Sequence, residues 1–154
     1  MKKRIGVVVL VLLLLLLAGA GAGFYYYYSK YINIDAIYPG VTIQGMSVGG
    51  MTQEEAEAKV QEYVDQVSQE TVTLQVRKKE TAFPLSDIGL KCTNMDVVEE
   101  AYNLGKTGNV FKRVMEVREL EKKGTDFPLT FSVDKEETKK VVAKKAKKFL
   151  AKKK

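Results

Sequence analysis

Histidine and tryptophan are absent from this 154-residue chain, and its only cysteine is Cys92. Without histidine the chain cannot build a Ser–His–Asp or Cys–His catalytic site, or a zinc site with histidine ligands. A single cysteine forms neither an internal disulfide nor a thiolate metal cluster, and its alternation with Ile88 and Leu90 is typical of a small core residue. The sequence therefore predicts a protein that is not an enzyme and that holds no metal and no cofactor.

The basic excess is confined to the two ends of the chain. Residues 1–30 carry four basic residues and no acid, residues 134–154 carry ten lysines and three acids, and residues 31–133 carry 11 basic and 16 acidic residues. A nucleic-acid surface would place basic residues on the body of the domain, so no nucleic-acid partner is expected. The glycine-rich stretch from Gly40 to Gly50 lacks the Gly-Lys-Ser/Thr ending of a phosphate loop, so no nucleotide is expected either.

The N-terminus has the composition of a membrane anchor. Ile5–Phe24 is a run of 20 residues without a charge, and a helix of that length spans about 30 Å, the thickness of the hydrocarbon layer. The basic residues at 2–4 predict a cytoplasmic tail at 1–4, a transmembrane helix at 5–24 and extracellular residues after about 25, with a juxtamembrane connector at 25–38. The alternative is a cleaved signal peptide, because Ala18-Gly-Ala20 resembles a cleavage site.

Helix starts are indicated by residues that cap free backbone N–H groups. A hydroxyl or carboxylate followed three residues later by glutamate has the spacing of a capping box. The pairs with this spacing are Thr52/Glu55, Asp96/Glu99 and Asp134/Glu137, and Asn109 is expected to cap a helix alone.

Apolar residues recur at helical spacing after each cap, which predicts one buried face per helix. The predicted buried residues are Ala56, Val60, Tyr63, Val64 and Val67 in 52–68; Val97, Ala101, Tyr102 and Leu104 in the helix that Gly105 ends; Val110, Phe111, Val114, Met115 and Leu120 in the next; and Val141, Val142, Phe149 and Leu150 in the last.

Short strands are expected between these helices. Residues 71–77 alternate with period two, and 41–43, 82–85, 88–92 and 127–133 are rich in residues that favour strands. Grouped strands with intervening helices indicate the α+β class. The predicted fold is an N-terminal transmembrane helix followed by one small exported mixed α/β domain with a short-stranded sheet.

The densest cluster of polar groups expected at the surface lies in and around the turn at 101–109. Its amide, ammonium and guanidinium donors beside a tyrosine would suit a sugar or a peptide carboxylate. The candidate binding residues are Tyr102, Asn103, Lys106, Asn109 and Arg113. The alternative is structural: Gly105 and Gly108 would shape a helix–helix turn, and Asn109 would cap the next helix.

Two stretches resemble the peptidoglycan-binding domain of Gram-positive membrane-anchored proteins. They are Gly40-Val-Thr-Ile-Gln-Gly45 with Gly50-Met-Thr52 and Glu55-Ala56, and Ala101-Tyr102 with Gly105-Lys106-Thr-Gly108-Asn109. The resemblance covers roughly 40–133, which places the domain at 39–133 and leaves a lysine-rich helix at 134–154. It implies an α+β fold and a role near the cell wall, and such domains occur ahead of L,D-transpeptidase or VanW-like domains.

The sequence thus predicts a single-pass membrane protein with a non-catalytic module facing the cell wall. The module would bind or position itself along peptidoglycan, as the N-terminal part of a longer L,D-transpeptidase-type protein with a downstream catalytic domain. Its partners would be the membrane and peptidoglycan. The alternative is a structural stalk or a protein-interaction module without affinity for glycan.

Overall fold

The structure is a computed structural model that describes residues 2–76 and 79–151. The helices are α1 (Lys2–Tyr27), α2 (Gln53–Gln69), α3 (Val97–Asn103), α4 (Val110–Lys123) and α5 (Lys135–Ala151), with a π-helical turn η1 (Tyr28–Ile32) and a 3-10 turn η2 (Leu85–Ile88). The strands are β1 (Val41–Ile43), β2 (Met46–Ser47), β3 (Thr71–Val76), β4 (Lys79–Pro84), β5 (Lys91–Cys92), β6 (Thr125–Phe127) and β7 (Phe131–Ser132). This mixture of helices and short sheets confirms the mixed α/β fold.

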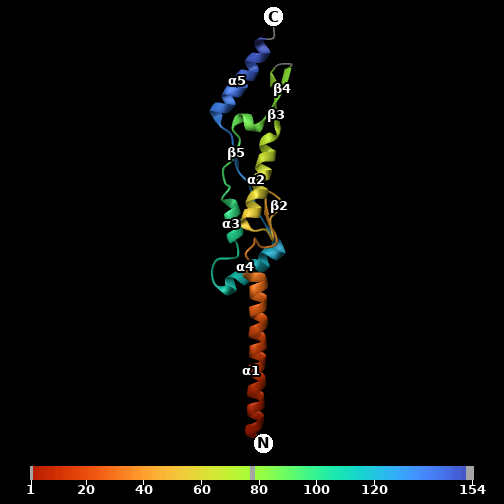
Figure 1. The fold of residues 1–154 in the computed structure, drawn as a ribbon, viewed down its shortest axis with the longest axis vertical. Coiled ribbons are helices and arrows are strands. Elements are labelled where there is room, and N and C mark those ends of the chain that lie inside the picture. Colours follow the sequence, from red (N-terminus) through yellow and green to blue (C-terminus); the bar gives the residue numbers. More distant parts are fainter. Residues whose placement is uncertain (1, 77–78, 152–154) are drawn as a thin grey trace.

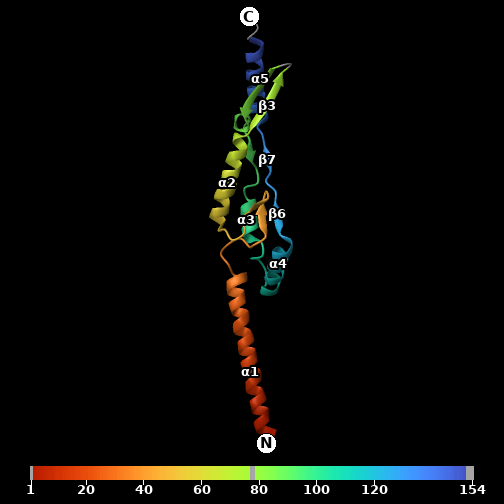
Figure 2. The ribbon, with the colours of Figure 1, turned by 90° about the vertical axis from the view of Figure 1, so that its right-hand side faces the viewer.

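The molecule is long and narrow, with α1 at one end and α5 at the other (Figure 1). Three small sheets follow one another along its long axis, as the turned view shows (Figure 2). They have the strand orders β2-β1-β6, β5-β7 and β3-β4, taken from the α1 end outward. Each sheet is too small to enclose a core, so helices α2, α3 and α4 supply the other walls.

Helix α1 is the apolar leader. In the part of the chain that the structure describes, Gly6–Ile32 is the one segment long and apolar enough to cross a membrane, judged by length and composition. Its leucines and valines pack against nothing in the domain and are 49–74 % exposed. The same composition also fits a signal sequence, so the fold alone leaves both predicted uses of the leader open.

The segment expected to be a juxtamembrane connector belongs in large part to the folded domain. Ile32, Ile37 and Tyr38 are fully buried in the same cluster as Val41 and Val60. The Ile37 amide donates to the Met51 carbonyl at 2.8 Å, and the Gly50 amide donates to the Ile37 carbonyl at 2.8 Å. The folded unit therefore begins before residue 39, because the apolar side chains just beyond the leader fill the space beneath β1.

The first sheet joins the two ends of the domain sequence. Strand β1 pairs antiparallel with β2 and parallel with β6, in register Thr42 with Asp126. One carboxylate oxygen of Asp126 accepts from the Thr42 hydroxyl at 2.6 Å and from the Gly45 amide at 2.8 Å. These bonds hold the β1–β2 turn, where Gln44 has a φ of 51°.

Helix α2 starts as its sequence predicts. The Thr52 hydroxyl accepts from the Glu55 amide, and the Glu55 carboxylate accepts from the Thr52 amide, so the capping box is formed. Ala56 and Val60 are buried, and Tyr63, Val64 and Val67 are half-buried on the same side. The predicted face of 52–68 is confirmed.

The second predicted capping box is wrong. Asp96 lies in helical conformation and its side chain makes no capping bond. The turn begins earlier instead, because the Val97 and Val98 amides donate to the carbonyls of Asn94 and Met95. Asp134 caps α5 as predicted, since its carboxylate accepts from the Glu136 and Glu137 amides at 2.8 and 2.9 Å. The reciprocal half of a capping box is not formed, because the Asp134 amide donates to the Ile88 carbonyl at 3.1 Å.

Two predicted strands are shorter than expected. Within 88–92 the strand starts only at Lys91, since Ile88 closes η2 and Gly89 follows with a φ of 66°. The run 127–133 is divided between two sheets, with Phe127 opposite Ile43 and Phe131 opposite Cys92. Pro128, which has no amide to donate, stands at the division.

The predicted buried face of α4 is wrong in part. Val110, Phe111 and Met115 are 42 %, 76 % and 57 % exposed, whereas Val117 and Leu120 are buried. The helix carries apolar residues on more than one side. Packing against η1, Gly40 and Gly105 selects the side that contains Val117 and Leu120. In α5, Val141 and Val142 are half-buried as expected. The predicted inward positions of Phe149 and Leu150 fall outside the side chains that the structure describes.

Ala56 and Ala58 allow a matched test of the α2 face. We expect Ala56→Asp to unfold the domain, because an unpaired carboxylate in the core costs several kcal/mol. Ala58 is exposed on the same helix, so Ala58→Asp should change the free energy of unfolding by about 0.5 kcal/mol or less. Thermal unfolding of the full chain in mild detergent, followed by circular dichroism, measures both. Equal melting temperatures for the two variants would contradict the assignment.

Asp126 should give the first sheet an acid-sensitive contact. The Thr42 hydroxyl and the Gly45 amide hold its pKa below the ordinary value of 3.8. A lowered folded pKa contributes stability that is present above the unfolded value and lost as the pH falls through the folded value. We therefore expect Asp126→Asn to lower the melting temperature at pH 7, and we expect this difference to shrink below about pH 3.8. A difference that is independent of pH would contradict the assignment, and Asp87→Asn is the control for general charge effects.

Candidate functional site

Arg113 ties α4 to the segment that follows the leader helix. Its guanidinium donates to the Tyr28 hydroxyl at 2.6 Å, to the Ile32 carbonyl at 3.0 Å and to the Gly105 carbonyl at 3.3 Å. A guanidinium suits this position because its planar fork reaches several acceptors at once, which an ammonium does not do. Arg113 therefore does not project into solvent as a free ligand-binding group.

Tyr102 and Lys106 lie beside this contact. The Tyr102 hydroxyl donates to the carboxylate of Asp35, and this hydrogen bond raises the pKa of Tyr102 above its ordinary value, with a smaller contribution from desolvation. The Lys106 ammonium stands 3.1 Å from the centroid of the Tyr102 ring. Its Nζ is buried and has no hydrogen-bond partner among the described residues, and this burial lowers the pKa of Lys106.

The turn between α3 and α4 is shaped by a glycine against an aromatic ring. Gly105 has a φ of 75°, and a Cβ there would lie 3.0 Å from the ring of Tyr38. The Tyr38 hydroxyl donates to the Ile32 carbonyl, which also accepts from Arg113. Asn109 caps α4, since its side-chain oxygen accepts from the Lys112 amide at 2.9 Å.

The five predicted site residues thus differ in what they can offer to a ligand. Asn109 and Arg113 make structural contacts, Tyr102 and Lys106 are half-buried against each other, and Asn103 is exposed. The sequence did not reveal Tyr28 and Asp35 as members of this cluster. Tyr28 lies 85 residues from Arg113, and Asp35 lies 67 residues from Tyr102. Local sequence patterns do not predict contacts over such separations.

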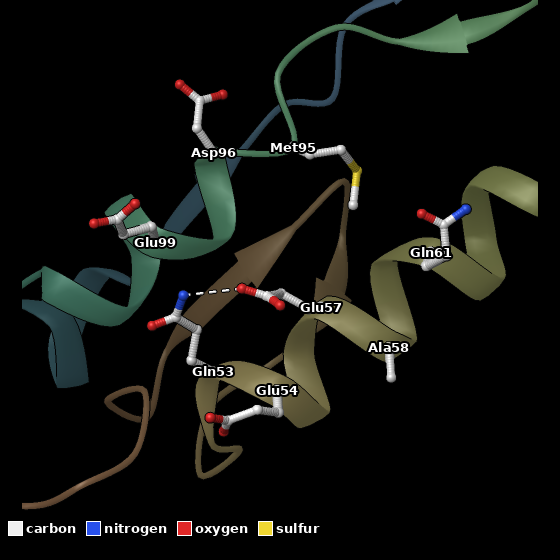
Figure 3. Close-up of a pocket in the computed structure, with 8 residues that line it drawn as sticks. All are labelled: Gln53, Glu54, Glu57, Ala58, Gln61, Met95, Asp96 and Glu99. Atoms are coloured by element: carbon white, nitrogen blue, oxygen red, sulfur yellow. Dashed lines mark hydrogen bonds between the residues drawn. The ribbon is translucent and has the colours of Figure 1, made fainter.

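A groove between α2 and α3 is a second candidate surface (Figure 3). Its volume is about 560 Å³, and it is open to solvent. The side chains that line it are Gln53, Glu54, Glu57, Ala58, Gln61, Met95, Asp96 and Glu99. The Gln53 amide donates to the Glu57 carboxylate at 2.9 Å, and the other carboxylates point into open space around the groove (Figure 3). Such a surface offers hydrogen-bond acceptors to hydroxyl, amide and ammonium groups.

The sequence did not predict this groove. Acidic residues in the first turn of a helix are already explained by their favourable interaction with the helix dipole. They are also not arranged as a metal site: among the described residues, no group of three acidic, histidine or cysteine side chains could hold an ion.

Helix α5 is the third charged surface. Its 17 residues include seven lysines and two glutamates, and it lies at the end of the molecule opposite α1 (Figure 1). Lys139 pairs with Glu136 at 3.0 Å. The remaining lysines give this end of the molecule a positive potential that attracts polyanions.

Residues 81–154 match the model of a protein family described as "Putative peptidoglycan binding domain". No curated protein and no solved structure matches the chain. The matched segment contains the turn at Tyr102–Asn109 and helix α5. It starts at Thr81, so the match lies farther along the chain than the expected 40–133, and the Gly40–Ala56 motif falls outside it. The matched family is a binding family, which agrees with a non-catalytic module.

Arg113 and Lys106 permit a matched test of structural against ligand-binding roles, since both are half-buried cations in the same cluster. We expect Arg113→Met to destabilise the fold by roughly 1–3 kcal/mol, because the Ile32 carbonyl loses a charged donor. We expect Lys106→Met to leave the melting temperature nearly unchanged, since the loss of a cation–π contact is offset by relief of a buried, unpartnered ammonium. Thermal unfolding of the two variants side by side is the measurement. A larger loss for Lys106→Met would reverse the assignment.

Proposed function

We propose that this chain is a membrane-anchored, non-catalytic module that faces the cell wall and binds peptidoglycan. The observation that carries the proposal is the match of residues 81–154 to a peptidoglycan-binding family. That segment includes α3, α4 and α5, so it contains both the predicted polar turn and the lysine-rich helix.

Membrane anchoring is supported by the energetics of the leader. A fully exposed leucine or valine side chain forgoes roughly 1.5–3 kcal/mol of burial free energy, and the leader holds 11 leucines and valines between Val7 and Leu17 that are each about half exposed or more. A bilayer removes that cost. The cations at Lys2, Lys3 and Arg4 favour a cytoplasmic N-terminus, which would put residues after about 25 outside the cell.

The position of α5 supports a contact with the wall. With α1 in the bilayer, α5 is at the far end of the molecule (Figure 1), so its lysines lie far from the lipid headgroups of that membrane. Peptidoglycan stem peptides carry carboxylates, and wall polymers of the same envelope carry phosphates. Both would be concentrated near α5 by simple electrostatic attraction.

Of the predicted site residues, Asn103 and the outer edge of Tyr102 stay open to wall material. Lys106, Asn109 and Arg113 would support them indirectly, since each is engaged within the domain. The α2–α3 groove is a further surface that could accept sugar hydroxyls or the ammonium groups of stem peptides, although only its α3 side lies within the matched segment.

A structural stalk is the second candidate function, and the narrow shape of the molecule favours it. The stack of three small sheets carries the chain from α1 to α5 along one axis (Figure 2). In either case the module would serve a wall-modifying catalytic domain, such as the L,D-transpeptidase or VanW-like domains that accompany the family it resembles. It would do so by holding that domain at a set height above the membrane.

Co-sedimentation with purified sacculi tests the proposal. The full chain in mild detergent is used, because a fragment that starts after Tyr28 loses the Arg113 contact. We expect retention at about 0.15 M salt, both on intact sacculi and on sacculi stripped of anionic wall polymers. Retention that requires low salt or the anionic polymers would favour the stalk.

The contribution of α5 is tested with two matched triple variants. Lys139, Lys140 and Lys144 are changed to glutamine in one, and Lys112, Lys122 and Lys123 of α4 in the other. All six side chains are exposed, and the two changes in net charge are equal. We expect the α5 variant to lose retention severalfold and the α4 variant to keep it. Equal losses would mean that net charge alone drives binding.

A further inference from the structure

Helix α4 carries an exposed face that the fold leaves without a partner. Phe111 and Met115 are 76 % and 57 % exposed, and Arg118 and Lys122 follow at helical spacing on the same side. This face points away from Val117 and Leu120, which are in the core. An exposed phenylalanine next to an exposed methionine forms a small apolar patch on one helix face, which is a candidate interaction surface.

The place of α4 in the molecule indicates what covers this face. Both views show α4 beside the end of α1 from which the domain emerges, with its N-terminal end the lowest part of the domain (Figures 1 and 2). Arg113 fixes this arrangement by its bonds to the Tyr28 hydroxyl and the Ile32 carbonyl. Side chains on a helix lean toward its N-terminus, so the side chains of the first turns of α4 lean toward the α1 end of the molecule.

The depth of these residues follows from helix geometry. If Phe24 marks the outer edge of the hydrocarbon layer, Tyr28 lies four residues further along, about 6 Å higher. The headgroup layer extends roughly 5–8 Å beyond the hydrocarbon on each side. A helix bonded to Tyr28 therefore runs within or against that layer, where an apolar face can reach the acyl boundary.

The charges of α4 suit the same location. The helix has five basic and three acidic residues. Glu116 and Glu119 are paired with Lys112 and Lys123 at 3.5 and 2.7 Å. Arg118, Lys122 and the single acid Glu121 form no ion pair within the described ranges, which leaves an excess of one unpaired cation on the outer surface of the helix. Two unpaired cations beside two exposed apolar side chains are the composition of a helix that lies on an anionic lipid surface.

We propose that α4 is an interfacial helix, which docks Phe111 and Met115 into the outer leaflet while Arg118 and Lys122 contact anionic lipid headgroups. The proposal rests on the membrane anchoring of α1 proposed above. With α1 and α4 both engaged, the domain has two points of attachment to the bilayer, and its long axis cannot swing freely about the end of α1.

The absence of tryptophan from the chain makes a direct test available. Three single-tryptophan variants of the full chain are placed singly in nanodiscs of phosphatidylcholine with about a quarter phosphatidylglycerol, the lipids carrying a quenching spin label. Phe111→Trp reports the proposed contact. Val72→Trp is the matched control, since Val72 is an exposed apolar residue on β3 at the far end of the molecule. Leu14→Trp, in the middle of the apolar run, reports whether α1 is in the bilayer.

We expect a label near the headgroups to quench Phe111→Trp at least about twofold more than Val72→Trp, with a blue-shifted emission for the former. Changing Arg118 and Lys122 to glutamine, or removing phosphatidylglycerol, should reduce this quenching. A label near the chain ends should quench Leu14→Trp.

The outcomes separate the two proposals. If Leu14→Trp is quenched and Phe111→Trp is not, the interfacial helix is wrong and the anchor stands. If Leu14→Trp is not quenched, the anchor itself is wrong. A blue shift of Phe111→Trp without lipid quenching would mean that protein, such as a second copy of this chain, covers the face, and it would overturn the proposal. The melting temperature of Phe111→Trp confirms that its fold is kept.

Discussion

The buried segment between the leader helix and β1 is the feature on which the rest of the molecule depends. Ile32, Ile37 and Tyr38 fill the centre of the domain, and the guanidinium of Arg113 reaches across from α4 to hold the start of that segment. The carbonyl of Ile32, a fully buried residue, accepts from both the Tyr38 hydroxyl and the Arg113 guanidinium, and a charged donor contributes more stability than a neutral one. Arg113 therefore links α4 to the end of the leader helix, beside the buried residues that follow it.

The fold could be predicted from the sequence wherever local chemistry decides the structure. The capping box at Thr52, the alternation in 71–76 and the apolar run of α1 each act over a few residues, and each gave the right element. The failures have two causes, one local and one in the packing of distant segments. Asp96 has the spacing of a cap, yet backbone carbonyls already hold the first amides of α3. The face of α4 was misassigned because periodicity detects apolar positions and not the surface that covers them.

In the candidate site, too, the residues with local roles could be predicted and those with distant partners could not. Asn109 as a helix cap and Gly105 as a turn residue could be inferred from the local sequence. The use of Arg113 could not, because its acceptors come from a segment that looks like a connector. The α2–α3 groove also escaped prediction, since it exists only where two helices distant in sequence place their carboxylates side by side (Figure 3). The charge along the molecule alternates in sign. Helix α4, beside α1, is net positive, the α2–α3 groove is negative, and α5 at the other end is positive.

The parallel pairing of β1 with β6 has a consequence for how the protein is made. Val41 and Thr125 are neighbours in the sheet, and the Thr125 amide donates to the Gly40 carbonyl at 2.9 Å. The parallel pairing of β1, the first strand, can therefore form only after β6 has been synthesised. Pairing between distant segments delays folding because the intervening chain has to be ordered first. During synthesis, β1 can pair with the adjacent β2, but its other edge has no partner until residue 127 has emerged. The nascent chain therefore carries an unpaired strand edge, which is exposed to aggregation until β6 arrives.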